Sequence, residues 1–259
     1  MGRRLPLVQQ QVIFGLTLTS MAISYIASGG AQTNTITIPT GHAAGDLLVM
    51  FAFRDGNTTA PTIPAGWTQV GLNTGTLTSS ATAYRVATSS SETSGTWTNA
   101  DALICHVYRG QLATGTPIVN SGAQAGTGTS INYSGIVTMT APGTSWVTLF
   151  AGHSSIDTSL ETAKSGTVNR SDNVGAVCEV AGHDTNGAVS SFSFGTVPVG
   201  GTSGNWITKT IEILASTGKA KVYNGASFVA KPAKVWNGTA WVAKPVKVWN
   251  GTAWVTTSY

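Results

Sequence analysis

The sequence contains few charged residues, few cysteines and few histidines. Of its 259 residues only 9% are charged, two are cysteine and four are histidine, whereas 41% are hydrophobic. This balance excludes a disordered chain, which would carry more charge and fewer aromatic residues. Two distant cysteines exclude a disulfide framework and a paired-cysteine zinc site. We expect Cys105 and Cys178 to be reduced, buried thiols, with a single disulfide between them as the alternative.

The sequence also lacks an uninterrupted apolar run that could span a membrane as a helix. Residues 12–32 imitate a secretion signal, because two arginines precede an apolar stretch that ends in small residues. Threonine and serine interrupt this stretch, and Phe14, Leu16 and Leu18 alternate with smaller or polar neighbours as in a strand. We therefore expect the first strand or strands of the folded body here, and no membrane insertion.

Catalytic motifs are absent as well. The chain contains no HExxH, no GxSxG and no phosphate-binding GxxxxGK[ST]. His153, His183, Asp157 and Asp184 could be combined into a metal or acid–base site, but their spacing fixes no shared geometry. The simpler interpretation places each histidine where a strand leaves its sheet, with its ring in a local hydrogen bond. We expect a protein that is not an enzyme and binds no cofactor.

Three aspartates raise the question of calcium, which takes several clustered oxygen ligands. Asp46, Asp55 and Asp101 lie in separate turns beside glycine or asparagine, where aspartate is favoured for backbone reasons. The sequence thus predicts no metal site.

Short strand-like segments separated by Gly, Ser, Thr and Asn fill most of the chain, and no convincing helical period appears. The segment "LLVMFAF" (47–53) is apolar without alternation, as expected for a strand that is covered on both faces. Further strands are expected at residues 35–38, 82–87, 102–110, 135–141, 145–153, 176–183, 190–195 and 205–214. This pattern predicts an all-β protein, a β-sandwich of jelly-roll type.

The C-terminal segment differs from the body in charge and in repetition. Residues 1–215 carry eight basic and ten acidic side chains, whereas residues 216–259 carry six lysines and no acid. From Lys221 a unit of thirteen residues recurs, as "KVYNGASFVAKPA", "KVWNGTAWVAKPV" and "KVWNGTAWV". We therefore predict two domains, a sandwich body at 1–216 and three β-hairpin repeats at 217–259.

Asn-Gly between β-prone residues is a strong signal for a tight hairpin turn. A two-residue loop would set Trp236 opposite Thr239 and Lys234 opposite Trp241. A single short hairpin is marginal in water, so three of them need a partner surface or each other. The repeats are thus expected to assemble with copies of themselves or with neighbouring chains.

Six aromatic residues of the repeats are the candidate contact residues for assembly or for a glycan: Tyr223, Phe228, Trp236, Trp241, Trp249 and Trp254. Aromatic faces flanked by lysines also suit nucleic acid. Six lysines without an arginine are few for a groove that follows phosphates, so we expect no nucleic-acid partner. The first interpretation is that these residues form the core of the hairpin stack, with sugar binding as the alternative.

The repeat "KVWNGTAWVAKPVKVWNGTAWV" resembles the hairpin repeats that end many tailed-bacteriophage virion proteins, known as minor tail or fibre proteins. The segments "ITIPTGHAAGDLLVMFAFRDGNTTAPTIPAGWTQV" and "AYRVATSSSETSGTWT" are similar to sandwich modules of such proteins. The resemblance implies a structural protein of the virion surface, assembled in the host cytoplasm, with other virion proteins as partners.

It also implies a homotrimer and a minor tail or fibre-like position. A capsid-decorating or head-fibre protein and a host-glycan adhesin are the alternatives. A glycan-degrading enzyme is the least favoured interpretation, because no nucleophile or pair of acids stands out.

Overall fold

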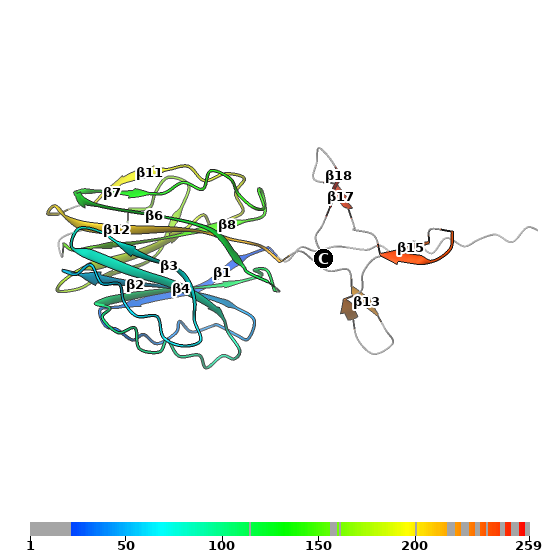
Figure 1. Cartoon of the computed structure of the whole chain (residues 1–259), viewed down its shortest axis with the longest axis horizontal. Coiled ribbons are helices and arrows are strands. Elements are labelled where there is room, and N and C mark those ends of the chain that lie inside the picture. Colours follow the sequence, from blue (N-terminus) through cyan, green and yellow to red (C-terminus); the bar gives the residue numbers. More distant parts are fainter. Residues whose placement is uncertain are drawn as a thin grey trace, which may run out of the picture. The chain divides into compact units, whose positions relative to one another are not determined.

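The computed structural model describes two parts of the chain, the body and the tail, which are treated separately (Figure 1). In the body it describes residues 22–113, 115–155, 160, 162–199 and 201–216. In the tail it describes residues 221–223, 228–230, 234–236, 238–243, 247–249 and 254–256. Every regular element in these ranges is a strand, which confirms the all-β class.

The body contains two five-stranded antiparallel sheets. Sheet 1 has the order β1-β5-β2-β4-β3, with β1 Ser24–Ala31, β2 Leu47–Asp55, β3 Thr68–Thr74, β4 Thr78–Val86 and β5 Ala102–Arg109. Sheet 2 has the order β6-β12-β8-β10-β9, with β6 Ile118–Gly128, β8 Trp146–His153, β9 Val168–Val174, β10 Glu179–Asp184 and β12 Gly204–Ile213. A two-stranded sheet pairs β7 Ser130–Tyr133 with β11 Gly195–Pro198.

The two large sheets pack face to face through one apolar core. Phe51 of β2 and Phe150 of β8 stack at its centre, with ring centroids 5.6 Å apart and an interplanar angle of 5°. Ile104 of sheet 1 and Ile207 and Ile211 of sheet 2 belong to the same cluster. The sandwich is thus confirmed, and it is held by side chains that alternate along each strand.

The outer faces of both sheets are covered as well. On β2, Leu47, Val49, Phe51 and Phe53 face the central core, whereas Leu48, Met50 and Ala52 belong to a second cluster with Trp67 and Trp97 from the loops. A third cluster covers sheet 2 with side chains of β7 and β11. The expectation that residues 47–53 form a strand buried on both faces is confirmed, because loops replace the helices that usually cover such strands.

The two halves of the body have the same topology. If β1 to β5 are matched in order with β6, β8, β9, β10 and β12, the two sheets have one and the same strand order. Two isolated bridges also correspond, since Thr37 pairs with Thr93 in the first half and Ile136 with Phe192 in the second. The body is therefore an internal structural duplication.

The duplication is also visible in residues and register. Phe51 and Phe150 occupy matching positions, so the central stack joins two equivalent residues. Leu72 lies opposite Ala81 in the first half, and Asp172 opposite Ala181 in the second. Residues identical at matching positions include Gly66 and Gly166, Asn73 and Asn173, and Gly75 and Gly175. Gly66 and Gly166 share a positive φ, of 85° and 83°, which explains why glycine stands at both.

Two expectations about the body need correction. The strand order is not that of a jelly roll, in which the chain passes repeatedly between the two sheets, because β1 to β5 all lie in sheet 1. Residues 35–38, 135–141 and 190–194 contribute only isolated bridges and cover the sheets, although their composition suits strands.

The sequence pattern did not predict the less apolar edge strands β3, β6 and β9, because apolar and polar residues alternate less clearly at the edge of a sheet. Residues 1–21, in which the first strand was expected to begin, lie outside the described residues.

Both cysteines lie free in the interior. Cys105 faces the loop-covered side of sheet 1, whereas Cys178 belongs to the central core. Burial raises the pKa of each thiol to about 12, so both stay protonated at neutral pH. The expectation of two reduced, buried thiols is confirmed.

The tail contains three antiparallel strand pairs: β13 Lys221–Tyr223 with β14 Phe228–Ala230, β15 Lys234–Trp236 with β16 Trp241–Ala243, and β17 Lys247–Trp249 with β18 Trp254–Thr256. The expected register is wrong. Trp236 lies opposite Trp241, and Lys234 opposite Ala243, so four residues rather than two separate the paired ends. Four-residue connections are common, and this one sets aromatic residues directly across from each other. That the three units associate into an assembly stays a prediction.

Replacing Phe51 by alanine should lower the free energy of unfolding of the full chain by about 3–5 kcal/mol. The change removes one ring of the central stack and leaves a cavity between two sheets that cannot close over it. Chemical denaturation followed by tryptophan fluorescence measures the effect. Leu72→Ala on the edge strand β3, where the side chain is 50% exposed, is the control and should cost less than about 1 kcal/mol. Equal losses in both variants would contradict the assignment of Phe51 to the centre of the core.

Candidate functional site

The six aromatic residues predicted as contact residues occupy equivalent places in the tail. Tyr223 pairs with Phe228, Trp236 with Trp241, and Trp249 with Trp254, each at the end of its ladder. Directly opposite positions of an antiparallel pair belong to the same face of the ladder. The register therefore places the six residues opposite each other in three pairs, one pair in each unit.

The other positions of each tail ladder are also repeated. The middle pair is Val222–Val229, Val235–Val242 or Val248–Val255, and a lysine begins each unit opposite alanine or threonine. Every ladder is three residue pairs long. The backbone of the tail thus repeats one small pattern of lysine, valine and aromatic residue.

The histidines and aspartates considered for a metal or acid–base site do not converge. His183 and Asp184 are neighbours on β10 and point to opposite faces of sheet 2, because side chains alternate along a strand. His153 accepts a hydrogen bond from Ser155 N at 3.0 Å, at the end of β8. Asp157 lies outside the described residues.

The three aspartates considered for calcium are divided between two places. Asp46 binds Arg109 at 2.7 Å and accepts a hydrogen bond from Ala43 N, so it fixes a loop. Asp101 accepts a hydrogen bond from Asp55 N at 2.8 Å. In the described ranges no group of three or more His, Cys, Asp or Glu side chains could hold a metal ion.

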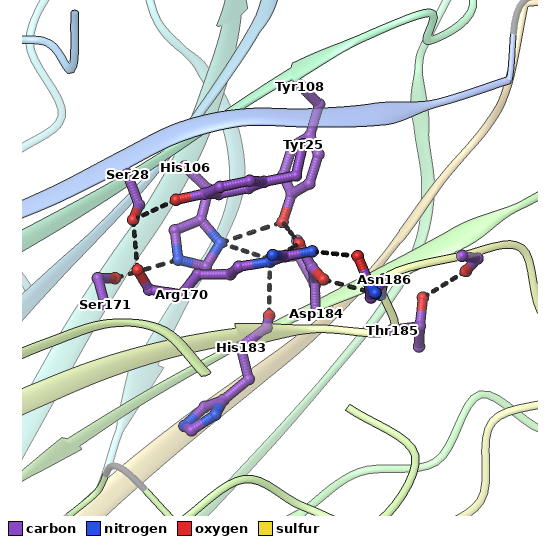
Figure 2. A network of polar contacts seen from close by, with 12 residues as sticks. Tyr25, Ser28, His106, Tyr108, Arg170, Ser171, His183, Asp184, Thr185 and Asn186 are labelled. Carbon is purple, nitrogen blue, oxygen red and sulfur yellow. Dashed lines mark hydrogen bonds and ion pairs between the residues drawn. The ribbon is translucent and has the colours of Figure 1, made fainter. Parts of the chain in front are cut away.

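Sequence reasoning missed a buried polar network between the two sheets (Figure 2). His106 of β5 is at its centre and is fully buried. Its Nδ1 lies 3.1 Å from Tyr108 Oη and 3.0 Å from Thr148 Oγ1 of the other sheet, and its Nε2 lies 3.2 Å from Ser171 Oγ of β9. The alternation of side chains within a single strand could not predict this network, because five separate strands contribute to it.

The hydrogen bonds around His106 define its tautomer. Tyr108 Oη donates to Asp184 Oδ2, and Thr148 Oγ1 donates to the carbonyl oxygen of His183. Both hydroxyl protons are therefore used elsewhere, so Nδ1 of His106 carries the proton and Nε2 accepts from Ser171. This assignment follows from the network as a whole.

A second part of the network continues to the surface of sheet 2. Arg170 of β9 forms an ion pair with the buried Asp184, with Nε and Oδ2 2.9 Å apart, and donates to Asn186 Oδ1 at 2.7 Å. The guanidinium lies 4.1 Å from the ring centroid of Tyr25, and Ser28 of β1 donates to the carbonyl oxygen of Arg170. Charge and hydrogen bonds thus join β1 and β5 of sheet 1 to β9 and β10 of sheet 2.

The serine and histidine of this network have the spacing of a nucleophile and its base. Three observations oppose catalysis. His106 has no exposed surface, its ring lies against Gly182, where an added Cβ would be only 2.2 Å from Nε2, and its Nδ1 meets hydroxyl groups instead of a carboxylate. Burial also holds the pKa of His106 well below its usual range. The network therefore fixes the two sheets to each other and leaves no room for a substrate beside the ring.

Comparison with protein-family models, with curated proteins and with solved structures found no match. Within the described residues no helix is long and apolar enough to cross a membrane.

Acid should destabilise the body, because burial lowers the pKa of three histidines. Desolvation is the main cause for His106, His153 and His183, and the pKa of His183 falls to about 4. A lowered pKa means that the unfolded chain binds protons first, so stability present above pH 6.5 is lost as the pH falls. His183 alone should account for about 2 kcal/mol between pH 7.5 and pH 5.

The free energy of unfolding measured at pH 7.5 and pH 5 checks this prediction. The loss on acidification should be about 2 kcal/mol smaller in His183→Gln than in the original chain. Val180→Ala on the same strand is the control, since it weakens the core but changes no titrating group. A pH dependence that is identical in all three proteins would refute the role of His183.

Proposed function

We propose that the protein is a non-enzymatic structural protein on the surface of a tailed-phage particle, with a minor tail or fibre-like position. The observation that carries the proposal is the tail, in which the six predicted residues form three equivalent aromatic pairs. The similarity of its repeats to those of virion proteins gives the proposal its particular form. In this proposal the body is a rigid module and the tail makes the contacts that assemble the protein.

The energetics of the tail support an assembly role. An isolated two-stranded ladder of three residue pairs is marginally stable at best in water. Ordering each residue costs about 1–2 kcal/mol of backbone entropy, whereas burying a large aromatic side chain gives roughly 2–3 kcal/mol. The aromatic pairs therefore need neighbours, and copies of the same repeat in a second and third chain supply matching surfaces. We propose a homotrimer on this basis and on the resemblance to fibre proteins.

The body supports a structural role in a different way. Both faces of each sheet are covered, and the Ser171–His106 pair is closed off between the sheets. Such a module keeps its shape without a ligand, as a component of a particle must. A capsid-decorating position would use the same two parts.

Replacing Trp236, Trp241, Trp249 and Trp254 together by serine should reduce the trimer to a monomer and abolish incorporation into particles. Serine removes the apolar surface that offsets the ordering of the tail. Light scattering gives the mass in solution, and immunodetection on purified particles gives incorporation. The matched control replaces the same four residues by phenylalanine, which preserves the aromatic pairs and should keep the trimer. A chain that ends at Ser216 should be a monomer with a cooperative melt.

Unchanged mass and incorporation in the serine variant would contradict the assembly role. In that case a glycan array distinguishes a glycan-binding tail from a tail that serves assembly. Binding of the original protein to host-surface glycans, lost in the serine variant, would identify the tail as an adhesin.

The protein should also release no fragments from host envelope polysaccharides. The reason is the closed position of His106, which has no exposed surface beside the hydroxyl groups of Ser171 and Thr148. Reducing-end assays and mass spectrometry of the polysaccharide measure release. Reproducible cleavage that disappears in Ser171→Ala or in His106→Gln would overturn the proposal that the protein is not an enzyme.

A further inference from the structure

The inner face of the β3–β4 end of sheet 1 is lined by small and hydroxyl-bearing residues. Along β3 and its turn stand Gly71, Asn73 and Gly75, and opposite them on β4 stand Thr82, Ser80 and Thr78. An added Cβ at Gly75 would meet Ala125 and Ile207 of sheet 2. This row therefore faces the other sheet.

Lys209 of β12 reaches into this row from the opposite sheet. Only 4% of the residue is exposed, and its Nζ lies 2.8 Å from the position that a Cβ on Gly71 would take. In the described part of the chain, Lys209 Nζ has neither a hydrogen bond nor an acidic partner. Almost all of the residue is thus enclosed, and no acidic side chain compensates its charge.

Four polar atoms of this row also lack hydrogen-bond partners. Asn73 Oδ1, Thr78 Oγ1, Ser80 Oγ and Thr82 Oγ1 are buried and make no hydrogen bond. Three of these four atoms are hydroxyl oxygens, whose protons can turn toward a bound group. Several buried polar groups without partners in one place require an explanation.

The duplicated half provides an internal comparison. There Gln32 fills the space beside Gly175, and its Nε2 donates to Asn173 Oδ1 at 3.0 Å. His106 fills the space beside Gly182 and pairs with Ser171. At the matching place in the second half, the polar atoms thus find hydrogen-bond partners within the chain. The polar atoms of the row that Lys209 enters have no such partners.

We propose that this row is a binding site for a small monovalent anion such as chloride, held by Lys209 Nζ and the hydroxyl groups of Ser80 and Thr82. A single buried ammonium needs one negative charge, and removing it from water without one costs several kcal/mol. Hydroxyl donors complete the shell of an anion, whereas the lysine excludes a cation. The half-buried strand β3 at the edge of the sheet gives the ion a short path from solvent.

Chloride should stabilise the full-length protein more than gluconate at equal ionic strength and pH 7. Gluconate is too large for the site, so general screening is the same and only specific binding differs. A ligand at ten times its Kd should raise Tm by about 3–6 °C in a domain of this size. No difference between the two salts would overturn the proposal.

Two variants test whether the chloride-specific rise in Tm depends on Lys209. Lys209→Met should lose the chloride-specific shift and melt at a higher temperature in gluconate, because the uncompensated charge is gone. Lys164→Met is the matched control, since Lys164 is also buried, at 6% exposure, but lies over the ring of Phe192. It should keep the shift. An equal shift in Lys209→Met would refute the site.

A direct measurement needs no variant. The ³⁵Cl NMR line of a chloride solution should broaden on addition of the original protein, and bromide should reverse the broadening by competition. An unbroadened line at chloride concentrations that raise Tm would contradict binding in the row around Lys209.

Discussion

The structure of the body depends on one contact, the packing of two equivalent sheets through the Phe51–Phe150 stack. Each sheet buries one face on the other, and the second face is covered by loops in sheet 1 and by the β7–β11 pair in sheet 2. Because every central strand is then enclosed, polar groups in the interior must find partners across the sheets. The hydrogen bonds of His106 with Thr148 and Ser171, and that of Tyr108 with Asp184, meet this requirement.

The duplication explains why the interior is not uniform. Matching positions kept the glycines and the asparagine that shape each outer strand pair, but the side chains that reach toward them differ. Gln32 and His106 complete one pair with hydrogen bonds, whereas Lys209 brings a charge to the other without a partner. A symmetrical fold can thus acquire one asymmetric binding site, because a single substitution in a facing strand changes the local charge balance.

The body and the tail differ in how their strands are stabilised. The body buries its apolar side chains, and pairs most of its buried polar groups, through contacts within one chain. The tail repeats a ladder too short for independent stability and spaces its aromatic pairs regularly. A rigid module attached to such a segment suits a component whose role is to be held in a larger assembly.

The sequence by itself determined the all-β class, the doubly covered strand at 47–53 and the repeated aromatic positions of the tail, because strand period and short repeats are local properties. Only the tertiary structure decided the order of the strands, the opposite placement of Trp236 and Trp241, and the meeting of His106, Thr148 and Ser171. The duplication was hidden as well, since few residues are identical between the halves. These features depend on contacts between residues far apart in the chain, and composition and local period carry no record of which distant strands become neighbours.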